Sequence, residues 1–210
     1  MKLHKPKFIK KTNIDLSNVP LHDMSCGLFR APLDIASKIM PELSEIFDSA
    51  PVENPTEWEV DVKIHMLMKD QYPCIPNWHC DNVPREEGKT RYDLIQDDVK
   101  PMYLWLSTNP TTEFLGQDWN TKGYIPKNHS ELAEFIKSSE SNGLKLEKVP
   151  SQTWISMDQR TPHRGTLSDK NQWRVFVRLT HNSIAPARPV ANDYIRRHCQ
   201  VYLNPETFSW

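Results

Sequence analysis

The chain has 210 residues, a formal net charge of −1 and four cysteines. That length suffices for one domain with a buried core, and the near-neutral charge excludes the global basic field of many nucleic-acid-binding proteins. No two cysteines have Cys-x-x-Cys spacing, which argues against a zinc ribbon. Because no apolar leader and no run of about 18 apolar residues is present, we expect no membrane association, and free thiols in a reducing, cytoplasmic compartment.

Residues 1–12 carry five lysines around Phe8 and Ile9. Chain termini are commonly loose, so one interpretation is a solvated tail or an edge strand. The alternative is an arm that contacts an anionic partner such as nucleic acid.

Apolar side chains recur at three- and four-residue spacing in residues 31–48, which predicts a helix that Pro41 kinks or divides. Seven acidic residues and no lysine or arginine occur from Glu42 to Asp61, which predicts a solvated face. We therefore expect residues 1–57 to form an arm and a helical segment that pack on the core.

Residues 58–69 alternate between apolar and polar side chains, the period of a half-buried strand. They lead into residues 72–85, which contain His79-Cys80-Asp81. On an extended strand His79 and Asp81 point to one face, about 7 Å apart along the chain, and Cys80 points to the other. A converging imidazole and carboxylate predict part of a metal site. The alternative is a surface histidine and aspartate that flank a buried cysteine.

Residues 82–100 are charged and turn-like, which predicts either a lid over the site or a passive connection. Residues 102–107 are apolar on both faces, as expected for a central strand. Residues 128–138 predict a helix, with Asn128 as the capping residue and Glu131 three positions later.

Residues 152–157 and 173–180 each predict a strand, and a second candidate ligand, His163, lies between them. The turn residues before the last strand predict a hairpin that places residues 174–178 opposite residues 163–167. In that arrangement His163 faces one or two arginines.

The constellation is therefore His79, Asp81 and His163, with Arg174 eleven positions after the second histidine and Arg178 further along the same strand face. Two histidines and one carboxylate make the facial triad of non-haem iron enzymes. An arginine that points into a barrel is costly unless an anion meets it. The alternative places both arginines in solvent and the intervening valines inside.

The order and spacing of these residues, across residues 58–182, resemble the iron(II)- and 2-oxoglutarate-dependent oxygenases. The resemblance implies a mainly β fold with flanking helices around a double-stranded β-helix (jelly-roll, cupin-like) core. We expect that core at residues 58–183, and a C-terminal tail at residues 184–210 within the same single domain.

For the site, the resemblance implies that His79, Asp81 and His163 hold iron(II). It implies that Arg174, or as second choice Arg178, binds the distal carboxylate of 2-oxoglutarate. Such an enzyme uses molecular oxygen and releases succinate and carbon dioxide. Because a carboxylate ligand is present, hydroxylation or oxidative demethylation is favoured over halogenation.

The substrate stays open between a small molecule and a nucleobase, with nucleic acid as a partner in the second case. One rival is a metal-binding cupin enzyme without 2-oxoglutarate, which needs no arginine partner. Another is a non-catalytic jelly-roll interaction protein. Trp78 and Trp105 are interpreted as core residues or as stacking platforms for a planar substrate, and His65 and His181 as structural.

Overall fold

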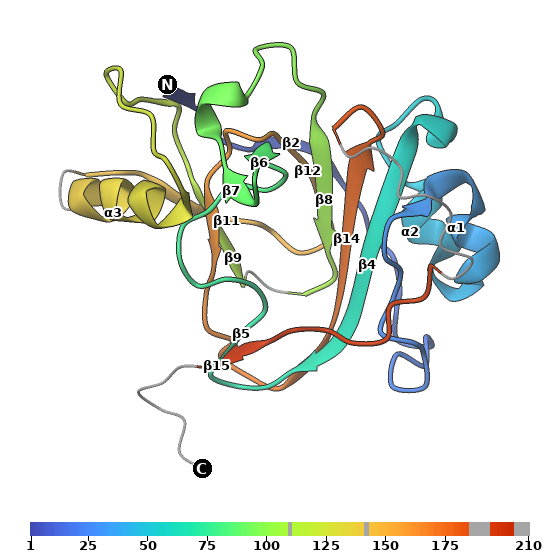
Figure 1. Cartoon of the computed structure of the whole chain (residues 1–210). Coiled ribbons are helices and arrows are strands. Elements are labelled where there is room, and N and C mark those ends of the chain that lie inside the picture. The colour runs from blue at the N-terminus through green and yellow to red at the C-terminus, as the bar shows by residue number, and fades with distance from the viewer. Residues whose placement is uncertain (109–110, 141–142, 185–193, 204–210) are drawn as a thin grey trace.

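The structure is a computed structural model that describes residues 1–108, 111–140, 143–184 and 194–203 (Figure 1). It is mainly β, with one large antiparallel sheet, a smaller sheet and a few helices. Within the described ranges, no helix is long and apolar enough to cross a membrane.

The larger sheet has six strands in the order β2-β12-β8-β14-β4-β3. The bounds are β2 (Lys7–Lys11), β12 (Thr153–Met157), β8 (Met102–Leu106), β14 (Gln172–His181), β4 (Trp58–Leu67) and β3 (Ala31–Pro32). β4 and β14 are paired from Trp58↔His181 to Leu67↔Gln172, which makes them the longest ladder of the described fold. The predicted central strand is confirmed, because β8 lies between β12 and β14.

The prediction that β4 is half-buried was wrong, because both of its faces are covered. One face packs against helices through Val60 and Val62. The other face carries Asp61, which is 4% exposed although the acidic run predicted a solvated face. The polar side chains of β4 on this face therefore point into the interior of the protein.

The smaller sheet has the order β11-β9-β13 and consists of β11 (Leu146–Lys148), β9 (Thr112–Leu115) and β13 (His163–Gly165). An isolated bridge joins His79 to His163 at its free side. The predicted hairpin is wrong: β13 pairs with β9, whereas β14 pairs with β4 and β8. The chain crosses from one sheet to the other between β13 and β14, so His163 faces β14 across the interior.

The two sheets pack face to face through Leu104 and Leu106 of β8, Phe114 of β9 and Ile155 of β12. The helices lie outside this sandwich, with α1 and α2 beside β4 and α3 beside the smaller sheet (Figure 1). Their bounds are α1 (Leu33–Ile39), η1 (Pro41–Leu43), α2 (Ser44–Asp48), η2 (Pro55–Glu57), η3 (Tyr92–Leu94) and α3 (His129–Glu140).

Both helix predictions are confirmed. The first helical region is divided at Pro41, which begins a 3-10 turn between α1 and α2. α3 is capped as expected, because Asn128 Oδ1 accepts a hydrogen bond from the Glu131 amide at 2.9 Å.

Three short strand pairs complete the described part of the fold. They are β1 (Lys2–Leu3) with β10 (Trp119–Asn120), β5 (Gln71–Tyr72) with β15 (Tyr202–Leu203), and β6 (Arg85–Glu86) with β7 (Lys89–Thr90). The lysine-rich arm is an edge strand, as one interpretation predicted: β2 pairs with β12, and all five of its residues are exposed.

Candidate metal centre

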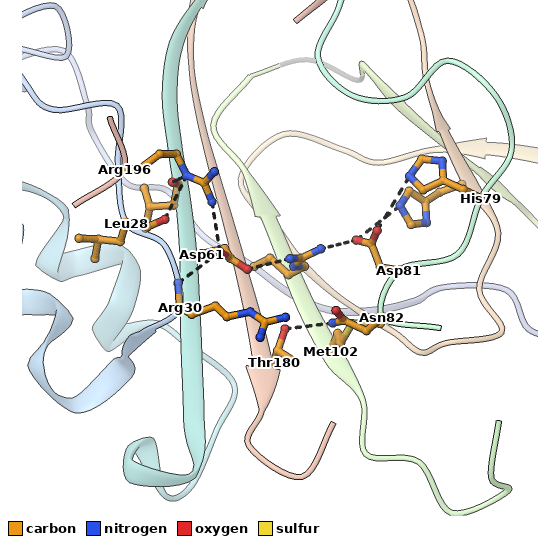
Figure 2. Close-up of polar contacts among 12 residues, drawn as sticks. Leu28, Arg30, Asp61, His79, Asp81, Asn82, Met102, Thr180 and Arg196 are labelled. Atoms are coloured by element: carbon orange, nitrogen blue, oxygen red, sulfur yellow. Dashed lines mark hydrogen bonds and ion pairs between the residues drawn. The ribbon is translucent and has the colours of Figure 1, made fainter. Parts of the chain in front are cut away.

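His79, Asp81 and His163 converge in the interior between the two sheets. Asp81 Oδ1 lies 3.9 Å from His79 Nε2, and Asp81 Oδ2 lies 3.7 Å from His163 Nε2. One ligand atom from each residue lies within 4.8 Å of the others, and the two imidazoles are buried. In Figure 2 the carboxylate of Asp81 points at the imidazole of His79. This group could hold a metal ion.

The backbone places the two histidines side by side. The amides of His79 and His163 each donate to the other's carbonyl, at 3.0 and 2.9 Å. The expected strand at residues 79–81 is shorter than predicted: the bridge stops at His79, and the chain turns at Asp81. The turn still directs the Asp81 carboxylate toward both imidazoles, whereas the side chain of Cys80 is buried beside α3.

Main-chain carbonyls fix the orientation of both rings. His79 Nδ1 lies 2.9 Å from the carbonyl of Asn77, and His163 Nδ1 lies 3.2 Å from the carbonyl of Thr161. Because a carbonyl only accepts, each Nδ1 must carry the proton. In a neutral imidazole with this tautomer, Nε2 is the unprotonated nitrogen. Both Nε2 atoms are directed toward Asp81, as metal ligation requires.

The electrostatics favour the metal-binding protonation states. Burial, together with the neighbouring His163, lowers the pKa of His79 to about 4. Burial by itself raises the pKa of Asp81, but Arg178, His163 and His79 outweigh it and hold that pKa well below its usual range. At neutral pH the site therefore presents a neutral imidazole from His79 and an ionised carboxylate from Asp81.

A cavity of about 210 Å³ opens at these ligands. It runs along β14, where Arg178, Phe176 and Arg174 share one face, and Gln200 and Tyr202 of the C-terminal segment also line it. Both arginines therefore point inward, and the interpretation that placed them in solvent is wrong.

Arg178 is already paired within the protein. Its Nη1 donates to Asp81 Oδ2 at 2.6 Å, and its Nη2 donates to Asp61 Oδ2 at 2.7 Å. Both contacts are charge-assisted and short. The guanidinium is thus held against the candidate metal ligand.

Arg174 has no such partner. It is 1% exposed, its Nε lacks a hydrogen bond, and no ion pair reaches it from the described residues. Its guanidinium lies over the ring of Phe176, 5.5 Å from the centroid. Burial lowers its pKa to about 10. A buried guanidinium without a protein anion is costly, so the cavity is suited to an anionic ligand.

Comparison of the chain with protein-family models, curated proteins and solved structures gives no match. Function is therefore inferred from the geometry of this cavity.

Sequence reasoning missed Asp61, Lys63, Gln200 and Tyr202 as neighbours of the site. Alternation along β4 puts Asp61 and Lys63 on one face, and that signal was present in the sequence. Which face is interior depends on the pairing with β14, where Asp61 meets Arg178 and Lys63 meets Phe176. Two residues interpreted as core are confirmed: Trp78 and Trp105 are fully buried, and neither lines the cavity.

Gly165 lets the segment that carries His79 approach β13. Its amide donates to the carbonyl of Ile75 at 2.8 Å, and a Cβ added to it would lie 2.5 Å from the carbonyl oxygen of Cys74. We expect Gly165→Ala to cost about 1–3 kcal/mol of stability. The variant should also bind metal more weakly, because the two histidines separate. Thermal unfolding with and without manganese(II) measures both effects, and an unchanged Tm would contradict the prediction.

His65 is buried opposite Arg174 on β4, and neither ring nitrogen has a hydrogen-bond partner. Burial, then Arg174 and Lys63, lower its pKa to about 3. The unfolded chain, with an ordinary pKa near 6.5, therefore takes up a proton between pH 7 and 5 that the folded chain refuses. Stability is lost as the pH falls, by about 2 kcal/mol over that range from this residue.

Urea unfolding of the metal-free protein at pH 7 and pH 5 checks this prediction. Wild type should lose about 2 kcal/mol more than His65→Leu over that range. The other histidines contribute equally to both proteins and cancel. An equal loss in the two proteins would show that His65 accepts the proton in the folded state.

Proposed function

We propose that this protein is an iron(II)- and 2-oxoglutarate-dependent oxygenase that hydroxylates, or oxidatively demethylates, a small molecule. The observation that carries the proposal is one cavity with two unlike ends. One end has two histidines and an aspartate whose ligand atoms converge, and the other has a buried guanidinium that forms no ion pair with the described residues. A 2-oxo dicarboxylate matches both ends.

The proposed core is a double-stranded β-helix. Its support is the way that the chain alternates between the sheets: β4, β8, β12 and β14 belong to the larger one. The His79 segment, β9, β11 and β13 belong to the smaller one. Eight segments divided in this way over two facing sheets are what a jelly roll requires.

The donor set fits iron(II). Two imidazoles and one carboxylate leave coordination positions open for other ligands, and this combination suits non-haem iron better than the thiolates of structural zinc sites. Cys74 and Cys80 are nearby in sequence, but burial raises the pKa of both thiols. Neither cysteine belongs to the group of described residues whose ligand atoms converge, so the set stays His79, Asp81 and His163.

Arg174 fits the distal carboxylate of 2-oxoglutarate. Its guanidinium offers a planar pair of donors to a carboxylate, and the low-dielectric cavity strengthens that contact. The cavity of about 210 Å³ suits a five-carbon acid that extends from the metal end to Arg174. Arg178 already forms ion pairs with Asp61 and Asp81. Arg174 therefore remains the first candidate for the distal carboxylate, and Arg178 the second.

When bound, iron(II) and 2-oxoglutarate supply the oxidising chemistry: 2-oxoglutarate, oxygen and a C–H bond become succinate, carbon dioxide and a C–OH group. The protein positions these reactants. His79 and His163 keep their Nε2 lone pairs directed inward through carbonyl contacts at Nδ1. Arg178 orients the Asp81 carboxylate, and Arg174 fixes the far end of the co-substrate. Gln200 and Tyr202 line the cavity from the C-terminal side.

A small-molecule substrate is favoured over nucleic acid. The lysine-rich strand β2 is an edge strand, separated from β14 by β12 and β8. No residue of the arm at positions 2–11 lines the cavity. A basic surface that guided a nucleobase to His79 would have to begin elsewhere.

Anaerobic titration of the metal-free protein with iron(II) and then 2-oxoglutarate tests the proposal. We expect the visible charge-transfer band of a metal-bound 2-oxo acid, followed by succinate formation when oxygen is admitted. Iron binding without the band would favour the cupin alternative. A protein that binds no iron would overturn both enzyme functions in favour of a non-catalytic scaffold.

A further inference from the structure

A line of ion pairs runs from the C-terminal segment to the candidate metal ligand. Arg196 Nη2 contacts Asp61 Oδ1 at 3.2 Å, and Asp61 Oδ2 accepts from Arg178 at 2.7 Å. Arg178 in turn donates to Asp81 Oδ2 at 2.6 Å. Figure 2 shows this line from Arg196 across β4 to Asp81. Charges therefore alternate without a gap from the edge of β4 to the cavity.

Residues 194–203, here called the C-terminal strap, lie along the edge of the larger sheet. The Arg196 amide donates to the carbonyl of Gly27 at 2.8 Å, and Arg196 Nε contacts the carbonyls of Leu28 and Val62 at 3.2 and 3.0 Å. Its far end pairs with β5 through β15, and between these anchors Gln200 lines the cavity. One segment thus forms both a cavity wall and the start of the ion-pair line.

Asp61 is the central member of the line. Its side chain is 5% exposed and holds two guanidinium groups, one on each oxygen. The Arg30 amide also donates to Oδ1, at 3.3 Å. Removing its charge would leave Arg178 and Arg196 in a buried position with one carboxylate fewer, which is strongly unfavourable.

Arg178 reaches Asp81 on one oxygen only. Asp81 Oδ2 receives the guanidinium, whereas no hydrogen bond reaches Oδ1 from the described residues, and Oδ1 lies toward His79. Asp61 holds the other arm of Arg178 and so fixes which edge of the guanidinium meets Asp81. The orientation of the ligand carboxylate is therefore set by residues that lie outside the triad.

We propose that Asp61 and Arg196 are positioning residues of the metal centre, which hold Asp81 through Arg178 and couple its orientation to docking of the C-terminal strap. This inference rests on the metal site of the proposed function and goes beyond it. It assigns a role to the strap, for which the sequence predicted none: the strap helps to hold Asp81 in its orientation.

The test compares manganese(II) affinity in wild type, Asp61→Asn, Arg196→Met and Arg196→Lys, each as the full chain. Asp61→Asn keeps the shape and removes the charge, and we expect about 10–100-fold weaker metal binding. Arg196→Met should have a smaller effect in the same direction, because the Asp61–Arg178 contact remains. Arg196→Lys should recover part of the affinity, since the charge opposite Asp61 is kept.

Glu113→Gln is the matched control. It removes the charge of an ion pair with Arg164 whose N–O distance is 2.8 Å. The side chains of this pair are about as buried as those of Asp61 and Arg178, but the pair does not contact Asp81. A purely structural role predicts that Asp61→Asn and Glu113→Gln both lower the Tm and leave manganese(II) affinity at the wild-type value. That result would overturn the inference. If Asp61→Asn does not fold, the two Arg196 variants decide. Wild-type manganese(II) affinity in both Arg196→Met and Arg196→Lys would then overturn the inference.

The same proteins are then titrated with 2-oxoglutarate under saturating iron(II). Arg196→Met should weaken co-substrate binding as well, because it removes the side-chain contacts that help to hold the strap carrying Gln200 and Tyr202. A wild-type protein that binds manganese(II) but gives no charge-transfer band would contradict the proposed function and leave the metal comparison valid. A wild type that binds no divalent metal would overturn both.

Discussion

Replacing His79 with alanine is expected to abolish tight binding of iron(II) and of manganese(II). The variant loses one of the three metal ligands. Asp81 and His163 alone form an incomplete site. Loss of an outer partner already costs about 10–100-fold in metal affinity, so loss of a ligand should exceed about 100-fold. Isothermal titration with manganese(II), and with iron(II) under anaerobic conditions, measures the effect.

His181→Ala is the control for this variant. His181 ends β14, packs edge-on against Trp58 and lies 3.5 Å from Glu57, outside the cavity. It should lose some stability and keep metal affinity. Equal metal binding by His79→Ala and His181→Ala would mean that the ions bind elsewhere, and the proposed metal centre would be abandoned.

The metal-free stability of His79→Ala sharpens the interpretation. A buried neutral imidazole packed beside His163, 4.4 Å between ring centroids, contributes apolar contact even without metal. We therefore compare the rise in Tm that manganese(II) produces in each protein, rather than the Tm alone. Wild type should gain stability with metal concentration, as any ligand that binds only the folded state requires. His79→Ala should gain nothing at the same concentrations.

The parts of the fold that sequence alone predicted are those with local signals. Alternation identified β4 and β14, the apolar run identified β8, and Asn128 with Glu131 identified the start of α3. The pair His79 and Asp81 was recognised in the same way, whereas His163 was added because the order and spacing of the three residues resemble a known family. Such signals depend on neighbours one to four residues apart.

The errors come from pairings between distant segments. A turn before β14 predicted a hairpin with β13, but the hydrogen-bond partners of β14 are β4 and β8, and nothing local selects them. The role of Asp61 was missed for the same reason. Its charge belongs to an acidic run in the sequence, and only the register that sets it opposite Arg178 makes it an interior residue. The resemblance placed Arg174 before Arg178 as the candidate, and in the structure the two differ in their ion-pair partners.

Arg174→Met is expected to raise the dissociation constant of 2-oxoglutarate by about 30-fold to several thousand-fold. Truncating one member of a buried, hydrogen-bonded charge pair costs about 2–5 kcal/mol, and each 1.4 kcal/mol is about tenfold. The dissociation constant of Arg174→Lys should lie between those of wild type and Arg174→Met. Lysine keeps the positive charge but lacks the planar pair of donors of a guanidinium. The charge-transfer band under anaerobic conditions measures both constants.

The direction in which Arg174→Met changes the stability of the metal-free protein distinguishes a co-substrate-binding arginine from a structural one. Without co-substrate, Arg174 is a buried cation that forms no ion pair with the described residues, so Arg174→Met should leave the stability of the metal-free protein unchanged or raise it. A structural arginine would make the variant less stable. Urea unfolding of the two metal-free proteins distinguishes the cases, because the same substitution must weaken the loaded state while sparing the empty one.

The chemistry of the ligand supplies the second control. 2-Oxopentanoate has the same chain length and the same metal-chelating end as 2-oxoglutarate, but it lacks the distal carboxylate. If Arg174 binds that carboxylate, wild type should prefer 2-oxoglutarate, and Arg174→Met should bind both acids with similar, weak affinity. If the variant still prefers 2-oxoglutarate as wild type does, another cation of the cavity holds the carboxylate. Lys63, which lies over the ring of Phe176 at 5.3 Å, would then be that residue.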